Sequence, residues 1–228
     1  MPCNVGYKSY AVIKIPESMS QTFKAKAEAP KIDAELLAKL GSDDSGFLEW
    51  ANGLDARPLL KEAIKRALVN IDAKGVKFSI NSECMLEAKG SYLNDREKRN
   101  LSKIVSCVSE RWRFEILGIV TQLLGYTFTV RQDGDGFILE AEEEGKSHPC
   151  GYIKVSKKGG NSTLVFEHFK SRKELQVETA KLLILAHKLG VKIVLGNSNI
   201  SEGDPFPSEH QHTHGHSHGY HHNRNREG

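Results

Sequence analysis

The stretch from Asn94 to Phe169 most constrains the fold, because the spacing of its apolar residues changes once. Up to Leu124 they recur at three- and four-residue steps, the spacing of one helix face. From Tyr126 onward they alternate with polar residues, which is typical of strands that bury one face. The sequence therefore predicts a long helix followed by a sheet.

The alternating segments predict two β-hairpins. "YTFTVRQ" (126–132) and "FILEAE" (137–142) flank "DGDG", and Asp-Gly between β-rich segments is a strong hairpin signal. "GYIKVS" (151–156) and "STLVFEHF" (162–169) flank "KKGGN" in the same way. Together they predict a four-stranded antiparallel meander.

Two capping patterns place the helices that should pack on this meander. Asn94 with Glu97 resembles a capping box and opens a helix to residue 124, either continuous or broken near Arg113. Gly118 is a weak point inside it. Ser171 with the acid three residues later opens a second helix, 172–189, which is apolar on more than one side and should be deeply packed.

The flanking segments carry further patterns of both kinds. Strands are predicted at 7–15, 76–80, 84–88 and, as a final interior strand, 191–195. Helices are predicted at 33–40, within "DSGFLEWA" (44–51), and at 55–73, where Asp55 caps the start and Gly75 ends the helix. Residues 17–30 are expected to form a connector.

These patterns predict an α+β fold. An antiparallel meander of four or more strands should pack against two main helices, beside a helix-rich N-terminal part. Residues 1–90 are expected to form a smaller α/β layer that is continuous with 91–196. Residues 197–228 are expected to be a disordered His-rich tail, because their composition cannot bury enough apolar surface to offset chain entropy.

Bulk composition bounds the possible partners. The 228 residues are 39% hydrophobic, and 32 Lys+Arg against 29 Asp+Glu give a net charge of +3, which is no strong nucleic-acid signal. No stretch resembles a membrane span or a secretory signal. Cys3, Cys84, Cys107 and Cys150 form no CxxC pair and indicate reduced thiols. We expect a cytoplasmic protein without membrane association. The sequence does not indicate how many copies of the chain associate.

The segment "HQHTHGHSHGYHH" carries the clearest chemical signal. Imidazole binds Ni²⁺, Zn²⁺, Cu²⁺ and Co²⁺, and residues two apart in an extended chain project to the same side. Without a rigid scaffold, selectivity should be low, and binding should weaken below the histidine pKa of about 6.5. The candidate ligands are His210, His212, His214, His216, His218, His221 and His222.

This segment resembles the histidine-rich segments of nickel chaperones for urease and hydrogenase maturation. The resemblance is compositional and covers some thirteen residues; the chain has neither a P-loop nor a Cys/His zinc ribbon, so no family site is carried over. Two other interpretations stay open: a purification tag, against which the irregular spacing speaks, and a solubilising tail without a metal role in the cell.

The rest of the sequence contains two weaker groups of candidate binding residues. His148 and Cys150 could form half of a zinc site, with Cys84, Cys107 or His168 as partners; the alternative is a loop histidine and a half-buried thiol. The cations Arg96, Arg99 and Lys103 line one helix face and could contact phosphates. Interspersed acids favour an ordinary salt-bridged surface instead: Asp95, Glu97, Glu110 and Glu115.

Three functions follow from these patterns. The first is a non-enzymatic protein whose tail binds metal for handling, storage or delivery to a client protein. The second is an adaptor whose meander or long helix binds another protein, with the tail incidental. The third is an enzyme whose polar residues, such as His148, His168 and Cys150, meet only in the fold.

Overall fold

The computed structural model describes residues 6–13, 45–69, 71–73, 75–82, 84–90, 94–147, 150–158, 161–193 and 195–203. Within these ranges, the side chains of residues 6–13, 45, 95, 158, 161 and 195–203 are not described. The predicted connector at 17–30, the helix at 33–40 and the tail from residue 204 onward lie outside the described residues.

The main sheet has six antiparallel strands in the order β4-β5-β6-β7-β1-β8. The predicted meander is confirmed as four consecutive strands of this sheet: β4 (Tyr126–Asp133), β5 (Gly136–Glu143), β6 (Tyr152–Lys158) and β7 (Asn161–Phe169). The first hairpin turns at Gly134, whose φ of 59° lies in the left-handed region that glycine adopts without cost.

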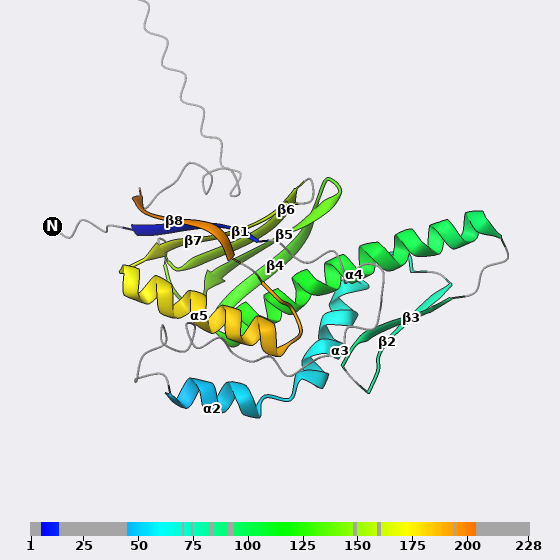
Figure 1. Cartoon of the computed structure of the whole chain (residues 1–228), viewed down its shortest axis with the longest axis horizontal. Coiled ribbons are helices and arrows are strands. Elements are labelled where there is room, and N and C mark those ends of the chain that lie inside the picture. The colour runs from blue at the N-terminus through cyan, green and yellow to red at the C-terminus, as the bar shows by residue number, and fades with distance from the viewer. Residues whose placement is uncertain are drawn as a thin grey trace, which may run out of the picture.

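The other two strands come from opposite ends of the described chain. β1 (Gly6–Ile13) pairs with β7 on one side and with β8 (Leu195–Gly203) on the other. The residues at 1–90 therefore supply a strand of the main sheet. Figure 1 shows β1 and β8 side by side along one margin of the sheet.

The predicted strand at 191–195 is wrong, and so is the start of the tail at 197. Residues 191–193 form no strand; Val191 is buried and donates its N–H to Ala186 O at 2.8 Å, which extends the end of the preceding helix. The strand begins at Leu195, runs to Gly203 and lies at the sheet edge. A polar edge strand needs only backbone pairing with one neighbour, so apolar periodicity does not mark it.

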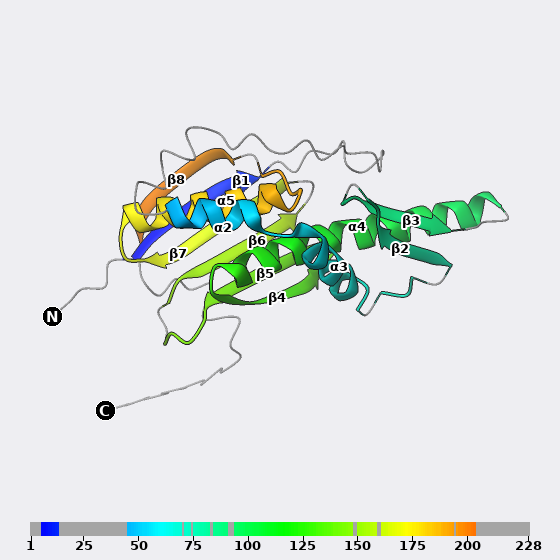
Figure 2. The same cartoon turned by 90° about the horizontal axis from the view of Figure 1, so that it is seen from below.

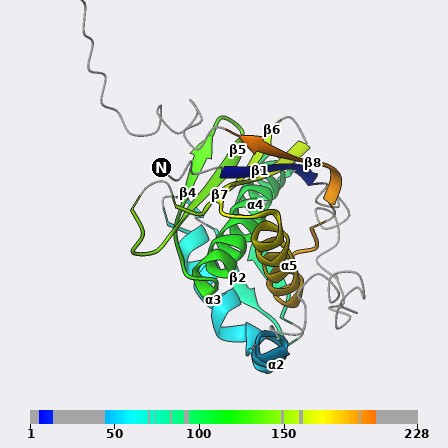
Figure 3. The ribbon, with the colours of Figure 1, turned by 90° about the vertical axis from the view of Figure 1, so that its left-hand side faces the viewer.

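Two helices cover one face of this sheet, as predicted. α4 (Asp95–Leu123) is one continuous helix of 29 residues, and α5 (Arg172–Lys188) runs beside it. The end-on view in Figure 3 shows the sheet as one layer and these helices as the next. Asn94 accepts a hydrogen bond from Glu97 N, and Ser171 from Glu174 N, so both predicted caps are present.

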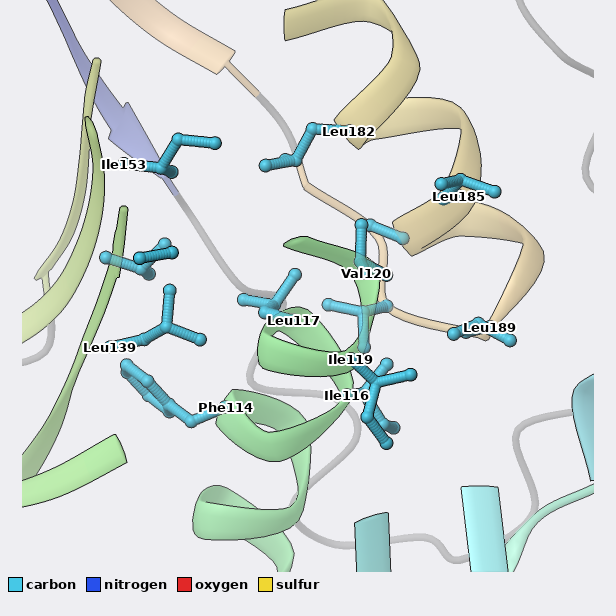
Figure 4. Close-up of a cluster of buried hydrophobic side chains, with 14 of the residues drawn as sticks. Phe114, Ile116, Leu117, Ile119, Val120, Leu139, Ile153, Leu182, Leu185 and Leu189 are labelled. Atoms are coloured by element: carbon cyan, nitrogen blue, oxygen red, sulfur yellow. The ribbon is translucent and has the colours of Figure 1, made fainter. Parts of the chain in front are cut away.

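The core lies between the sheet and the two helices (Figure 4). Its fully buried side chains come from α4, the central strands and α5: Phe114, Ile116, Leu117, Leu139, Ile153, Leu164, Phe166, Leu175, Leu182 and Leu185. Residues 182–186 of α5 are all buried, which confirms that this helix is enclosed on more than one side. Gly118 of α4 meets the ring of Phe128 so closely that a Cβ atom there would overlap the ring.

The remaining elements pack on the far side of the helices. α2 (Ser45–Gly53) contacts α5, α3 (Ala56–Ala67) crosses α4, and the hairpin of β2 (Val76–Ile80) and β3 (Leu86–Gly90) lies along the first half of α4. Figure 2 shows α2 and α3 in front of α5 and α4. The helix predicted in "DSGFLEWA" and the first strand of the small hairpin are confirmed, and the second strand begins two residues later than predicted, at Leu86.

The helix predicted at 55–73 starts correctly and ends too late. Asp55 caps it by accepting a hydrogen bond from Arg57 N, but α3 stops at Ala67. Arg111 of α4 donates to the carbonyl of Val69 at 2.6 Å, and Asn70 and Asp72 have low helix propensity. Gly75, with φ of 84°, marks the turn into β2 and does not end the helix.

Candidate functional site

The seven histidines of the tail, His210 to His222, lie outside the described residues, as does His148. Their metal-binding role stays a prediction from sequence. Among the described residues, no group of three or more His, Cys, Asp or Glu side chains is arranged to hold a metal ion.

The other members of the proposed half-site come from separate elements. Cys150 lies just before β6 and His168 near the end of β7, at the same end of two neighbouring strands. Cys84 lies in the turn between β2 and β3, and Cys107 in the middle of α4. Burial raises the pKa of the Cys150 thiol, and the negative charge of Glu142 raises it further. A raised pKa disfavours the thiolate, which is the form needed for metal binding or nucleophilic attack.

His168 occupies a strained backbone position. Its φ is 65°, and the pairing of β7 with β1 shifts register here, because only Lys8 lies opposite Glu167 and His168. This is a β-bulge, which redirects side chains locally. Glu167 is buried, and its Oε2 lies 4.0 Å from His168 Nε2.

Titratable side chains gather around this end of the sheet. The clearest pair is Tyr126, at the start of β4, and Glu178, in the middle of α5, whose side chains interact electrostatically. Tyr126 is only 5% exposed. Burial raises the pKa of both groups, so the phenol keeps its proton and the carboxyl holds its proton to higher pH than usual.

Neighbouring charges surround that pair. Glu143 of β5 and Glu174 of α5 raise the pKa of Tyr126 further, while Lys181 favours the ionised form of Glu178. Gly151 leaves room here, because a Cβ atom at this position would lie 3.3 Å from the Tyr126 hydroxyl oxygen. The arrangement places two groups with raised pKa, the Tyr126 phenol and the Glu178 carboxyl, between the sheet and α5. It offers no activated nucleophile.

A second polar group lies on the sheet face away from the helices. Glu140 accepts hydrogen bonds from Arg131 Nε at 3.2 Å and from the Tyr152 hydroxyl at 3.1 Å, and Lys154 Nζ lies 3.8 Å away. Contact with Arg131 lowers the pKa of Glu140 despite the opposing effect of burial. These are cross-strand contacts of the kind that stabilise a sheet.

Sequence reasoning missed the Tyr126–Glu178 pair. Tyr126 carries only the alternation of a strand, and Glu178 only the polarity of a helix position. Fifty-two residues separate them, and no local pattern links them, so tertiary packing alone makes this contact.

The described residues include no helix long and apolar enough to cross a membrane. Comparison of the chain with protein families, with curated proteins and with solved structures found no match, so its function must be inferred from its own residues.

Proposed function

We propose that this protein is a non-enzymatic binder of divalent transition-metal ions, and that the C-terminal histidines hold the metal for storage or for delivery to a client. One observation carries the proposal: five histidines, His210 to His218, occupy every second position. In an extended chain, residues two apart lie about 6.6 Å from each other on the same side, and rotation of the intervening polar or small residues lets neighbouring imidazoles meet at one ion.

We expect Ni²⁺ or Zn²⁺ as the ion, with Cu²⁺ and Co²⁺ as further candidates, because imidazole binds all four ions. Seven imidazoles provide for two or more ions when each ion takes two or three ligands. The remaining coordination positions are then open to water or to a client's ligands, which suits transfer of the metal.

Isothermal titration of the full chain with Ni²⁺ and Zn²⁺ at pH 7.5 tests the proposal. We expect two or more ions to bind with micromolar affinity. The comparison is a chain that ends at Gly203, because β8 extends to that residue and earlier truncation would remove part of the sheet edge. Equal heats from both chains would refute the proposal.

A matched full-length variant tests the spacing itself. It keeps the composition of residues 210–222 but places all seven histidines together at the end of the segment. If the alternate spacing sets the stoichiometry, this variant binds a different number of ions than the natural tail. Identical stoichiometry and affinity would show that histidine content alone is responsible.

A further inference from the structure

The first half of α4 extends past the sheet and is supported there by the β2–β3 hairpin (Figure 1). Leu101 faces this hairpin, where it lies close to Gly90. The projecting segment is amphipathic, and its apolar side is already used within the molecule.

Three exposed cations occupy the opposite side of this segment. Each helical residue advances by about 100°, so Arg96, Arg99 and Lys103 fall within an arc of about 60°, some 160° from Leu101. All three side chains are exposed. They span about 10.5 Å along the helix axis. We call these three residues the cationic stripe.

Two of the acids that were expected to neutralise this face form ion pairs elsewhere in the described structure. Glu110 lies in the same arc two turns further on, but its Oε1 is 3.0 Å from Lys157 Nζ of β6. Glu115 is buried and pairs with Arg111. Glu97 is half-buried and lies about 100° around the helix from Arg96. In the described part of the chain, therefore, no acidic side chain is paired with the stripe.

The Glu110–Lys157 contact also orients the stripe. Glu110 shares the arc and contacts Lys157 near the C-terminal end of β6, so the stripe lies on the side of α4 that faces this end of the strand. Asn100 and Ser106 flank the stripe and are exposed. Arginine, lysine, asparagine and serine are the side chains that contact phosphate oxygens in protein–DNA complexes.

We propose that the cationic stripe binds the phosphate backbone of double-stranded DNA. A straight, projecting helix can lie along a duplex, whereas single strands are usually held by aromatic side chains that stack on bases. The described side chains of this projecting segment, residues 96–106, include no aromatic residue. Binding through phosphates alone is independent of sequence, with dissociation constants of about 10⁻⁴ to 10⁻⁶ M.

Fluorescence anisotropy with a labelled 25-base-pair duplex tests this, using the full chain with EDTA so that the tail carries no metal. Three phosphate contacts contribute about −2.7 to the slope of log K against log salt concentration. The variant Arg96→Gln/Arg99→Gln/Lys103→Gln should lose that contribution and about tenfold or more of the affinity at low salt.

The matched control is Lys61→Gln/Lys65→Gln/Lys173→Gln, which removes the same charge from other exposed positions. This variant should keep the natural slope, and circular dichroism should show both variants folded. Three results would overturn the proposal: no saturable binding of the duplex, equal losses in both variants, or preference for a single strand or an acidic polypeptide of equal charge.

Discussion

Replacing Gly118 by alanine sets two known effects against each other. In a helix interior, Gly→Ala stabilises by about 1 kcal/mol because alanine loses less backbone entropy on folding. Here, however, the added Cβ would overlap the ring of Phe128 on β4. That ring is half-buried, and the guanidinium of Arg66 lies over it at 5.2 Å from its centre, so it cannot move aside freely.

Overpacking of a core costs about 1–3 kcal/mol, and a direct overlap with a clamped ring belongs at the upper end. After the helix gain is subtracted, we expect Gly118→Ala to lower the free energy of unfolding by about 1–2 kcal/mol. For a chain of this size, each kcal/mol lowers Tm by about 2–4 °C. Urea denaturation followed by circular dichroism measures the change.

A double-mutant cycle separates the two effects. In a Phe128→Ala background the ring is gone, so Gly118→Ala should stabilise by about 1 kcal/mol. The change of sign corresponds to a coupling of about 2–3 kcal/mol. Stabilisation by Gly118→Ala in the natural chain, or the same loss in both backgrounds, would refute the steric explanation.

Three further predictions concern other parts of the molecule. Glu178→Gln should remove a pH dependence: burial raises the pKa of Glu178, so its contribution to stability is full below about pH 4.3 and is lost as pH rises through the folded pKa. The free energy of unfolding of the natural chain should therefore fall relative to the variant between pH 4 and 8, and parallel curves would contradict this. Ser171→Ala should lower the free energy of unfolding by about 1 kcal/mol because Glu174 N loses its acceptor at 3.1 Å, whereas Ser147→Ala in an exposed loop should not change it in the same urea titration. Binding of Ni²⁺ by the tail should weaken by at least tenfold between pH 7.5 and 5.5, because protonated imidazole cannot coordinate; calorimetry at both values checks this, and unchanged affinity would point to other ligands.

The sequence alone predicted the helices and strands whose signals are local. The meander follows from alternation and from Asp-Gly, and the starts of α4 and α5 follow from Asn94 and Ser171. Each of these signals acts within a few residues, through a hydrogen bond or a turn geometry that the chain makes with itself. The sequence left open whether this helix is continuous or broken near Arg113, and the structure shows one unbroken helix.

The sequence could not predict the partners of distant segments. β1 lies between β7 and β8 although more than 140 residues separate it from either, and β8 carries a polar sequence without strand periodicity. Just beyond the end of α3, the carbonyl of Val69 accepts a hydrogen bond from Arg111, which lies 42 residues away in the chain. These outcomes depend on which backbone groups become neighbours after folding.

The same division applies to the functional features. Spacing alone defines the alternate histidines and the arc of Arg96, Arg99 and Lys103, because both depend only on the repeat of an extended chain or a helix. Only the tertiary structure decides that Glu110, which lies in that arc, pairs with Lys157 and that Glu115 pairs with Arg111. It likewise joins Tyr126 to Glu178, because a side-chain contact between a strand and a helix requires the two layers to be packed.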